Sequence, residues 1–337
     1  MQPQSKPRRG GCGGARPRRA PARSRGWSAA LSAALALTVL SCSGDDTARS
    51  RAAVAPRIAC GSAPAEALTR MALGDAVPVT RPVPEDADPA HWVPTREGVA
   101  AMRDARLVVL AGAGLEAWVT GASLPPSRTL DAARGSDARW IQLPVTRHTH
   151  GNGEEHTHSG NDPHVWLDPD LLELQLAHIA DGAARAFPDA KGALEAERTV
   201  WQQGVADLRA QLARVAAALE AQVGSRPLLA AWPCYGYLAR ALGVEVQNAA
   251  FDPWAAPDAV ATDAGLRKLE QAAASSAGVL LWPTPPPADL ARRIESQLGV
   301  TSVHFDAWLR PADNAPPLAR LKDSLARLEA ALARQAR

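Results

Sequence analysis

The residues best suited to chemistry lie in the stretch 148–169, which reads HTHGNGEEHTHSGNDPHVWLDP. Imidazole and carboxylate groups are common ligands of zinc and related divalent ions. Four histidines of this stretch lie within eleven residues, and these are His148, His150, His156 and His158. A fifth, His164, stands apart in the phrase DPHVWLDP. The stretch therefore predicts metal binding of two kinds, one on a histidine-rich run and one at a fixed position.

The histidine-rich run is predicted to form a flexible loop over residues 147–160, in which Glu154 and Glu155 accompany the imidazoles. Because such a loop must be ordered each time it captures an ion, we expect weak, multiple and exchangeable binding. Imidazole suits zinc, whereas manganese prefers oxygen ligands. A solvated polar loop without a role is the alternative. His178 lies among apolar residues on a helical pattern and is predicted to be structural.

The first 41 residues are not part of the predicted fold. Residues 1–26 carry eight basic residues and no acidic one, and residues 27–40 are apolar (WSAALSAALALTVL). This order is typical of a secretory signal, and the apolar run is too short to span a membrane comfortably. Cys42 follows in a sequence that resembles a bacterial lipobox. We therefore expect an exported protein, lipid-anchored through Cys42 and facing the periplasm or the cell exterior; an ordinary signal peptide is the alternative.

Removal of the signal changes the sign of the net charge. The full chain has 37 basic and 35 acidic residues, and loss of the eight basic residues of the signal leaves 29 against 35, a net charge of −6. This balance supplies no basic patch and argues against nucleic-acid binding. Beyond Cys42 the only cysteines are Cys60 and Cys234. Export would allow them to pair, and the sequence leaves that pairing open.

Short apolar runs alternate with helical patterns through the rest of the chain, which predicts parallel sheets flanked by helices. Over residues 190–222 apolar side chains recur at helical spacing for roughly 30 residues, about 45 Å of helix at 1.5 Å per residue. A coiled coil is the alternative, but no partner segment follows. The expected fold class is α/β, with two lobes joined by one long rigid helix. The expected parts after the signal are a tether (42–56), an N-terminal lobe (57–189), the linking helix (190–222) and a C-terminal lobe (223–337).

These features together resemble one family of proteins. The lipobox, the two-lobe pattern, LVVLAGAGLEAW (107–118) and DPHVWLDP (162–169) are similar to the zinc/manganese-type solute-binding lipoproteins of bacterial ABC transporters. The resemblance runs in order over about residues 57–335. It implies a monomer that captures zinc, with manganese less favoured, between its lobes and delivers the ion to an ABC permease in the inner membrane. Motifs of hydrolases and phosphate loops are absent from the sequence, so no enzyme activity is expected.

The resemblance transfers the ligand set of that family only in part. Members usually hold the ion with three histidines and one carboxylate. The second histidine corresponds to His164, and the carboxylate corresponds to Asp306 in HFDAWL. The first histidine corresponds to Ala90, with His91 one residue late, and the third corresponds to Trp232. The implied metal site is therefore His164, Asp306 and His91.

Two further positions bear on the missing third histidine. His304 shares a strand face with Asp306 and is one possible substitute, and Cys234 is another. An acidic position that some members use near the fourth ligand corresponds to Trp282.

The tryptophans support a different hypothesis for the cleft. Because indole faces attract cations, a divergent paralogue could bind an organic or chelated ligand in a cleft lined by Trp232 and Trp282. Trp92 and Trp166 are expected to approach the same cleft. A third hypothesis is a passive zinc buffer, in which only the histidine-rich loop binds metal and no permease is involved.

Overall fold

The computed structural model describes residues 55–149, 155–255, 259–311 and 315–335. The predicted signal (1–41), Cys42, His150 and nearly all of the predicted tether lie outside these ranges. Within them, no helix combines the length and the apolar character that a membrane crossing would need.

The first sheet is built from the N-terminal part of the chain. Its four strands are all parallel and lie in the order β2-β1-β3-β4. The strands are β1 (Ala55–Cys60), β2 (Val79–Thr80), β3 (Ala105–Leu110) and β4 (Thr129–Asp131). The helices between them are α1 (Ala63–Leu73) and α2 (Arg96–Arg103). Thr95 caps α2 by accepting the backbone N–H of Gly98, as expected for threonine before a helical pattern.

The second sheet repeats this plan in the C-terminal part. Its four parallel strands lie in the order β10-β9-β7-β8. The strands are β7 (Leu228–Ala230), β8 (Val246–Asn248), β9 (Val279–Trp282) and β10 (Thr301–His304). The accompanying helices are α5 (Gly236–Leu242), α6 (Asp263–Ala273) and α7 (Ala288–Leu298).

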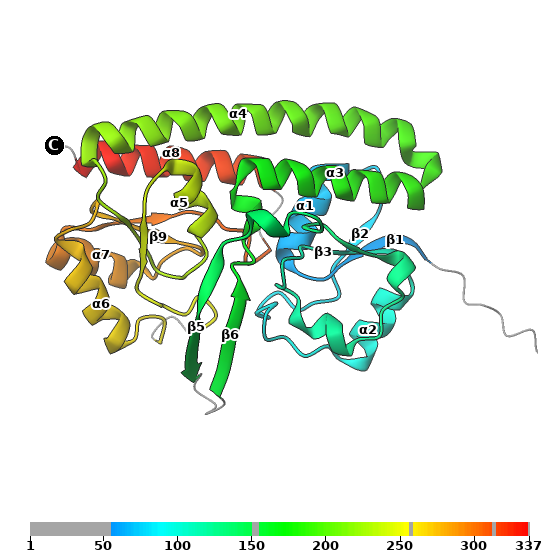
Figure 1. Ribbon diagram of the computed structural model, residues 1–337, viewed down its shortest axis with the longest axis horizontal. Helices are drawn as coiled ribbons and strands as arrows, with labels where there is room; N and C mark the ends of the chain where they lie inside the picture. The colour runs from blue at the N-terminus through cyan, green and yellow to red at the C-terminus, as the bar shows by residue number, and fades with distance from the viewer. Residues whose placement is uncertain (1–54, 150–154, 256–258, 312–314, 336–337) are drawn as a thin grey trace, which may run out of the picture. The chain divides into compact units, whose positions relative to one another are not determined.

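One long helix packs against elements of both halves. Helix α4 (Lys191–Val223) has 33 residues, and it contacts α1, α3 (Pro169–Ala186), α5 and α8 (Pro317–Gln335). Figure 1 shows α4 and α8 running side by side. The helix buries one stripe of side chains, which consists of Leu194, Trp201, Gly204, Val205, Leu208, Leu212, Val215, Leu219 and Val223. The predicted α/β class with parallel sheets and one long helix is confirmed; the lobe boundaries at 189 and 223 stay a prediction.

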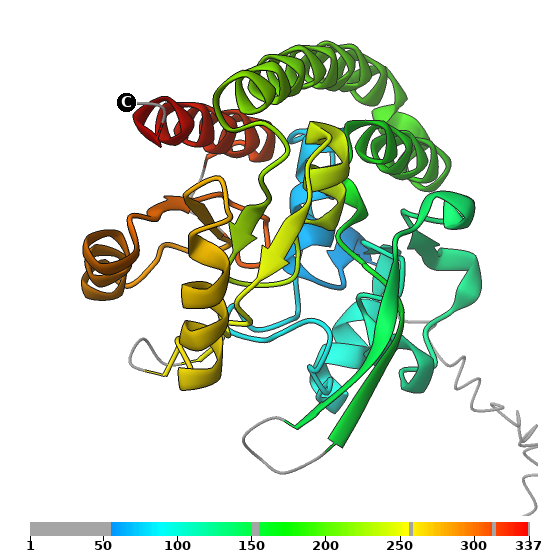
Figure 2. The same ribbon diagram turned by 60° about the vertical axis from the view of Figure 1, so that its left-hand side comes forward.

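The histidine-rich segment differs from the prediction. Strands β5 (Gln142–Thr149) and β6 (Glu155–Asn161) form an antiparallel hairpin where a loop was expected over 147–160 (Figure 2). The register places His148 opposite His156 and Thr146 opposite His158. The difference arises because the two segments pair through their backbones, which requires no apolar alternation of side chains.

Short 3-10 helices complete the chain path. They are η1 (Ala117–Gly121), η2 (Pro126–Arg128), η3 (Asp137–Arg139), η4 (Val165–Leu167) and η5 (Pro188–Ala190). Just before η1, the buried carboxylate of Glu116 accepts the Ser62 hydroxyl at 2.6 Å and the backbone N–H groups of Ala111 and Gly112. The Gly-Ala-Gly-Leu-Glu phrase therefore joins the end of β3 to the start of α1, which is a structural role.

Candidate metal centre

His164 is held in a fixed orientation between the hairpin and α3. Asp162 Oδ1 accepts the backbone N–H of His164 at 3.0 Å and lies 2.6 Å from its ring Nδ1. A carboxylate at Nδ1 favours the tautomer with the proton on that nitrogen, which leaves the lone pair on Nε2. The ring is largely buried, and no described residue forms a hydrogen bond with Nε2. A carboxylate behind a histidine is the usual support for a metal-binding imidazole.

The start of α5 supports Asp162 in turn. The Tyr237 hydroxyl donates to the backbone carbonyl of Asp162 at 3.1 Å and accepts the backbone N–H of Ile141 at 3.0 Å. Gly236 allows this close approach, because a Cβ at that position would lie 2.6 Å from Asp162 Oδ2. The backbone around His164 is therefore held by residues that are distant in the sequence.

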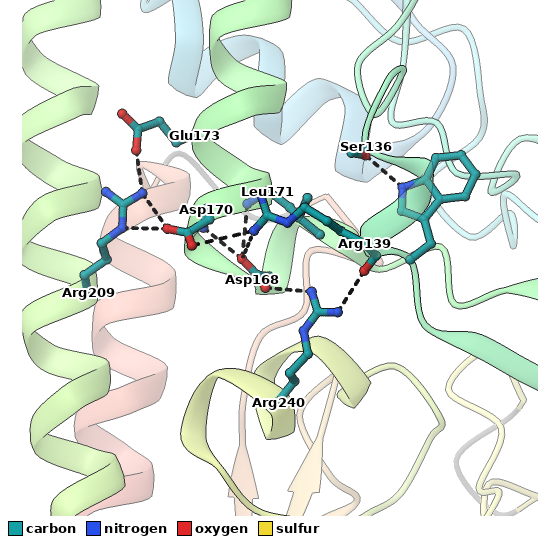
Figure 3. Close-up of polar contacts among 9 residues, drawn as sticks. Ser136, Arg139, Asp168, Asp170, Leu171, Glu173, Arg209 and Arg240 are labelled. Atoms are coloured by element: carbon teal, nitrogen blue, oxygen red, sulfur yellow. Dashed lines mark hydrogen bonds and ion pairs between the residues drawn. The ribbon is translucent and has the colours of Figure 1, made fainter.

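A second set of polar contacts holds the end of the DPHVWLDP phrase. Figure 3 shows Asp168 at the start of α3, where its Oδ1 accepts the backbone N–H groups of Asp170 and Leu171. Its other oxygen pairs with Arg240 of α5 at 2.7 Å. Arg209 of α4 pairs with Asp170 at 2.8 Å, so the first turn of α3 is tied to two other helices. The Asp-Pro pair acts as an N-cap followed by proline at the first helical position.

Trp166 connects the His164 segment to the segment that carries Asp306. Its ring is fully buried and packs edge-on against His164, with centroids 5.3 Å apart. Its Nε1–H donates to the carbonyl of Ala307 at 3.1 Å. The two segments are thus adjacent in space although about 140 residues apart in the chain. Trp166 was expected to approach the cleft, and it is instead part of the core.

Asp306 lies just after β10 with both carboxylate oxygens engaged. Oδ1 accepts the backbone N–H of Trp308 at 2.9 Å, and Oδ2 pairs with Arg320 Nε of α8 at 2.6 Å. His304 and Asp306 line one cavity of about 540 Å³, together with Trp282. Burial lowers the pKa of His304, so its imidazole is neutral at pH 7, the form that binds metals.

His91 and Trp232 line a different cavity of about 880 Å³. His91 Nδ1 lies 2.5 Å from Asp88 Oδ2, and the hydrogen bond with this carboxylate raises the pKa of the histidine. The backbone N–H of Ala90 donates to the other oxygen of Asp88 at 3.0 Å. Because the histidine stands at position 91 and alanine at position 90, the imidazole lies beside Asp88 on an exposed turn.

The structure does not bring the predicted ligands into one cluster. His91 lines one cavity, Asp306 lines the other, and His164 lines neither. In the described part of the chain, no three His, Cys, Asp or Glu side chains lie close enough to hold one metal ion.

The other residues considered from the sequence are Cys60, Cys234, Trp282 and His178, and all four have structural surroundings. Cys234 is fully buried, and burial raises the pKa of its thiol, which argues against it as a thiolate ligand. Both Cys60 and Cys234 are free, so the disulfide left open by the sequence is not formed. Trp282 is buried against Phe251, with ring centroids 5.4 Å apart. His178 Nδ1 lies 3.0 Å from the carbonyl of Ala132, as expected for a structural histidine.

Sequence reasoning missed two kinds of residue at these sites. Asp162 stands two residues before His164, and that spacing is the signal of an aspartate that accepts a nearby backbone N–H. Trp118, Asp252 and Trp254 also line the larger cavity, and no spacing in the sequence connects them with Trp92 and Trp232.

Comparison with known proteins decides the family. The sequence profile of the family described as zinc-uptake complex component A, periplasmic, matches residues 58–322. The chain belongs to this family. The family description names a component of a zinc-uptake complex and no enzyme, in agreement with the expectation that the chain has no enzyme activity. This ZnuA-type chain is also similar to curated proteins and to solved structures.

Two curated relatives show how far the similarity reaches. The zinc-binding lipoprotein AdcA of Streptococcus pneumoniae is 28% identical over 142 residues, 39% of this chain and 27% of that protein. The high-affinity zinc uptake system protein ZnuA of Bacillus subtilis is 26% identical over 202 residues, 56% of this chain and 58% of that protein. The chain thus matches less than two thirds of the length of either relative.

The fold of this ZnuA-family chain is also found in a solved structure. The metal-dependent lipoprotein YcdH of Bacillus subtilis superimposes with a TM-score of 0.64 at 20% identity, over 82% of this chain and 99% of that one. At this identity the likeness establishes the fold alone, and it agrees with the α/β architecture expected from the sequence.

Proposed function

We propose that this family member captures zinc outside the cytoplasm for an ABC-type uptake system, with His164 as the anchoring ligand. The observation that carries the proposal is the pairing of His164 Nδ1 with Asp162 at 2.6 Å, which orients the Nε2 lone pair. Neutral imidazole and carboxylate are suitable zinc ligands, and a carrier that must release its ion is served by them better than by four thiolates. Manganese is less favoured.

Asp306 and His91 are the other proposed ligands, in a cleft between an N-terminal lobe (57–189) and a C-terminal lobe (223–337). The hydrogen bond from Trp166 to Ala307 supports Asp306, because it places the neighbouring backbone beside the His164 turn. Coordination by all three side chains requires Asp306 to turn from Arg320 and the His91 turn to move. Zinc is the cargo, and the remaining ligand positions would be filled by water or by a neighbouring side chain.

The cellular setting follows the same proposal. Residues 1–41 direct export, Cys42 carries the lipid anchor, and the monomeric chain faces the periplasm or the cell exterior. The receiving partner is an ABC permease in the inner membrane. The histidines at 148, 150, 156 and 158 collect ions loosely before transfer to His164. The backbone register of β5 and β6 supports this, because it sets His148 opposite His156.

Zinc titration with and without the histidines at 148–158 tests whether the tight site is separate from the weak sites. The matched variant replaces His148, His150, His156 and His158 with glutamine, which keeps the backbone pairing. We expect one tight site in both proteins and several weak sites in the unchanged protein only, measured by isothermal titration calorimetry. Absence of a tight site from both would contradict zinc capture. Loss of all zinc binding in the variant would favour the passive buffer.

Substitution of Arg320 tests whether Asp306 is a ligand. The guanidinium lies 2.6 Å from Asp306 Oδ2 and competes with a cation for that carboxylate. We expect Arg320→Gln to raise the zinc affinity about tenfold, because a positive charge next to the ligand is removed. Competition with a chromogenic chelator measures the change, and thermal unfolding shows whether the variant is folded. An unchanged or weaker affinity in a folded Arg320→Gln protein would remove Asp306 from the ligand set.

A further inference from the structure

The cavity of about 880 Å³ carries four tryptophans, and we call it the tryptophan pocket. Its indole rings form two pairs. Trp92 and Trp118 come from the N-terminal half, with ring centroids 5.2 Å apart at an interplanar angle of 83°. Trp232 and Trp254 come from the C-terminal half, with centroids 5.7 Å apart at 78°. The volume is within the range of pockets that bury a small organic molecule.

Three of the four tryptophans in this pocket keep part of their surface accessible, and Trp118 is buried. Trp92, Trp232 and Trp254 are half-buried, whereas Trp166, Trp282 and Trp308 are fully buried in the core. Each pair is close to perpendicular, so its two rings form a corner of indole surface. An indole nitrogen donates a hydrogen bond and offers no lone pair to a metal. The rings therefore suit an organic group better than a bare ion.

The charged groups of the pocket are acidic. Asp88 and Asp252 line it with His91, and among its described lining residues there is no lysine or arginine. One oxygen of Asp252 accepts the backbone N–H of Trp254 at 2.8 Å. Even with a protonated imidazole the lining has a net negative charge, so the pocket favours a cation over an anion.

The cavity of about 540 Å³ differs from the tryptophan pocket in its charge and in the exposure of its aromatic rings. It is lined by Arg310 and Arg320 as well as by Asp306, and its aromatic residues Phe251 and Trp282 are buried against each other. The combination of accessible indole faces and an excess of carboxylates over cationic side chains is a property of the tryptophan pocket.

We propose that the tryptophan pocket binds an organic cation of the quaternary or methylated ammonium class. Indole faces attract such a cation through their quadrupoles, and they also bury its methyl groups. The carboxylates of Asp88 and Asp252 supply the balancing charge. His91, one of the proposed zinc ligands, lines the pocket, whereas His164 and Asp306 do not. The anchoring zinc ligand can therefore be altered without changing the lining of the pocket.

The first test uses the mature protein, the full chain after removal of the signal, with a chelator present to exclude metal. Choline is the probe, and its uncharged isostere 3,3-dimethyl-1-butanol is the matched control. We expect saturable binding of one choline, followed by calorimetry and tryptophan fluorescence, with the isostere at least about tenfold weaker. Absence of saturable choline binding up to about 10 mM, tenfold above a Kd of 1 mM, or equal affinity for the isostere, would overturn the proposal.

Variants then locate the site. Trp232→Ala and Asp252→Asn are each expected to weaken choline binding about tenfold or more. Trp140→Phe alters a tryptophan outside the pocket, and His164→Ala alters the anchoring zinc ligand, which also lies outside it. Both variants are expected to bind choline as the unchanged protein does. Loss of choline binding in folded His164→Ala, or its retention in folded Trp232→Ala and Asp252→Asn, would contradict a site at the tryptophan pocket.

Discussion

Replacement of His164 with alanine is expected to weaken tight zinc binding at least about a hundredfold, because it removes an imidazole whose orientation is fixed by a buried carboxylate. The next two residues, Val165 and Trp166, are buried and apolar, so they offer no replacement ligand. Competition against a chelator of known affinity measures the loss. Thermal unfolding without metal shows whether the variant keeps its fold.

Two further variants make the His164 result specific. Asp162→Asn keeps an oxygen acceptor near Nδ1 but removes the charge, and we expect it to weaken zinc binding about tenfold. His178→Gln alters a histidine of α3 that contacts the carbonyl of Ala132, and zinc binding should be unchanged. Tight binding that persists in folded His164→Ala would contradict the proposed anchor, and a loss in His178→Gln equal to that in His164→Ala would show an indirect effect.

Replacement of Trp166 with alanine is expected to lower the free energy of unfolding by about 3–5 kcal/mol. The ring is fully buried, and its Nε1–H donates to Ala307 at 3.1 Å, so the change leaves a cavity and an unpaired carbonyl. Urea unfolding followed by circular dichroism measures this quantity. A loss below about 1 kcal/mol would show that the segments around His164 and Asp306 are held together by other contacts.

Trp166→Phe separates the two contributions. It keeps most of the apolar area and removes the hydrogen bond to Ala307, for which we expect a loss of about 1–2 kcal/mol. If this bond positions the Asp306 segment for zinc, the folded Phe variant will also bind zinc more weakly. Unchanged zinc affinity in that variant would limit the role of Trp166 to stability.

The secondary structure was predictable where the local pattern is strong. Residues 107–110 of the apolar run at 107–114 lie in β3. The helical spacing over 190–222 corresponds to α4, because a long amphipathic helix has many residues that show the same period. Strand β4 was not predictable, since its three residues, Thr129–Asp131, are too few to show an alternating pattern. The pairing of β5 with β6 differs from the loop predicted over 147–160, because the histidines and glutamates of this segment lack the apolar alternation that indicates a strand.

The sequence by itself determined the family and the order of the elements, because these depend on local phrases such as DPHVWLDP. The role of His164 in that phrase stays a prediction. The tertiary structure alone decided which side chains meet. Asp306 pairs with Arg320 of α8, Asp162 receives support from α5, and Trp92 and Trp232 line one pocket although 140 positions separate them. Such contacts depend on how parallel strands and helices pack, and packing between distant segments leaves no periodic trace in the sequence.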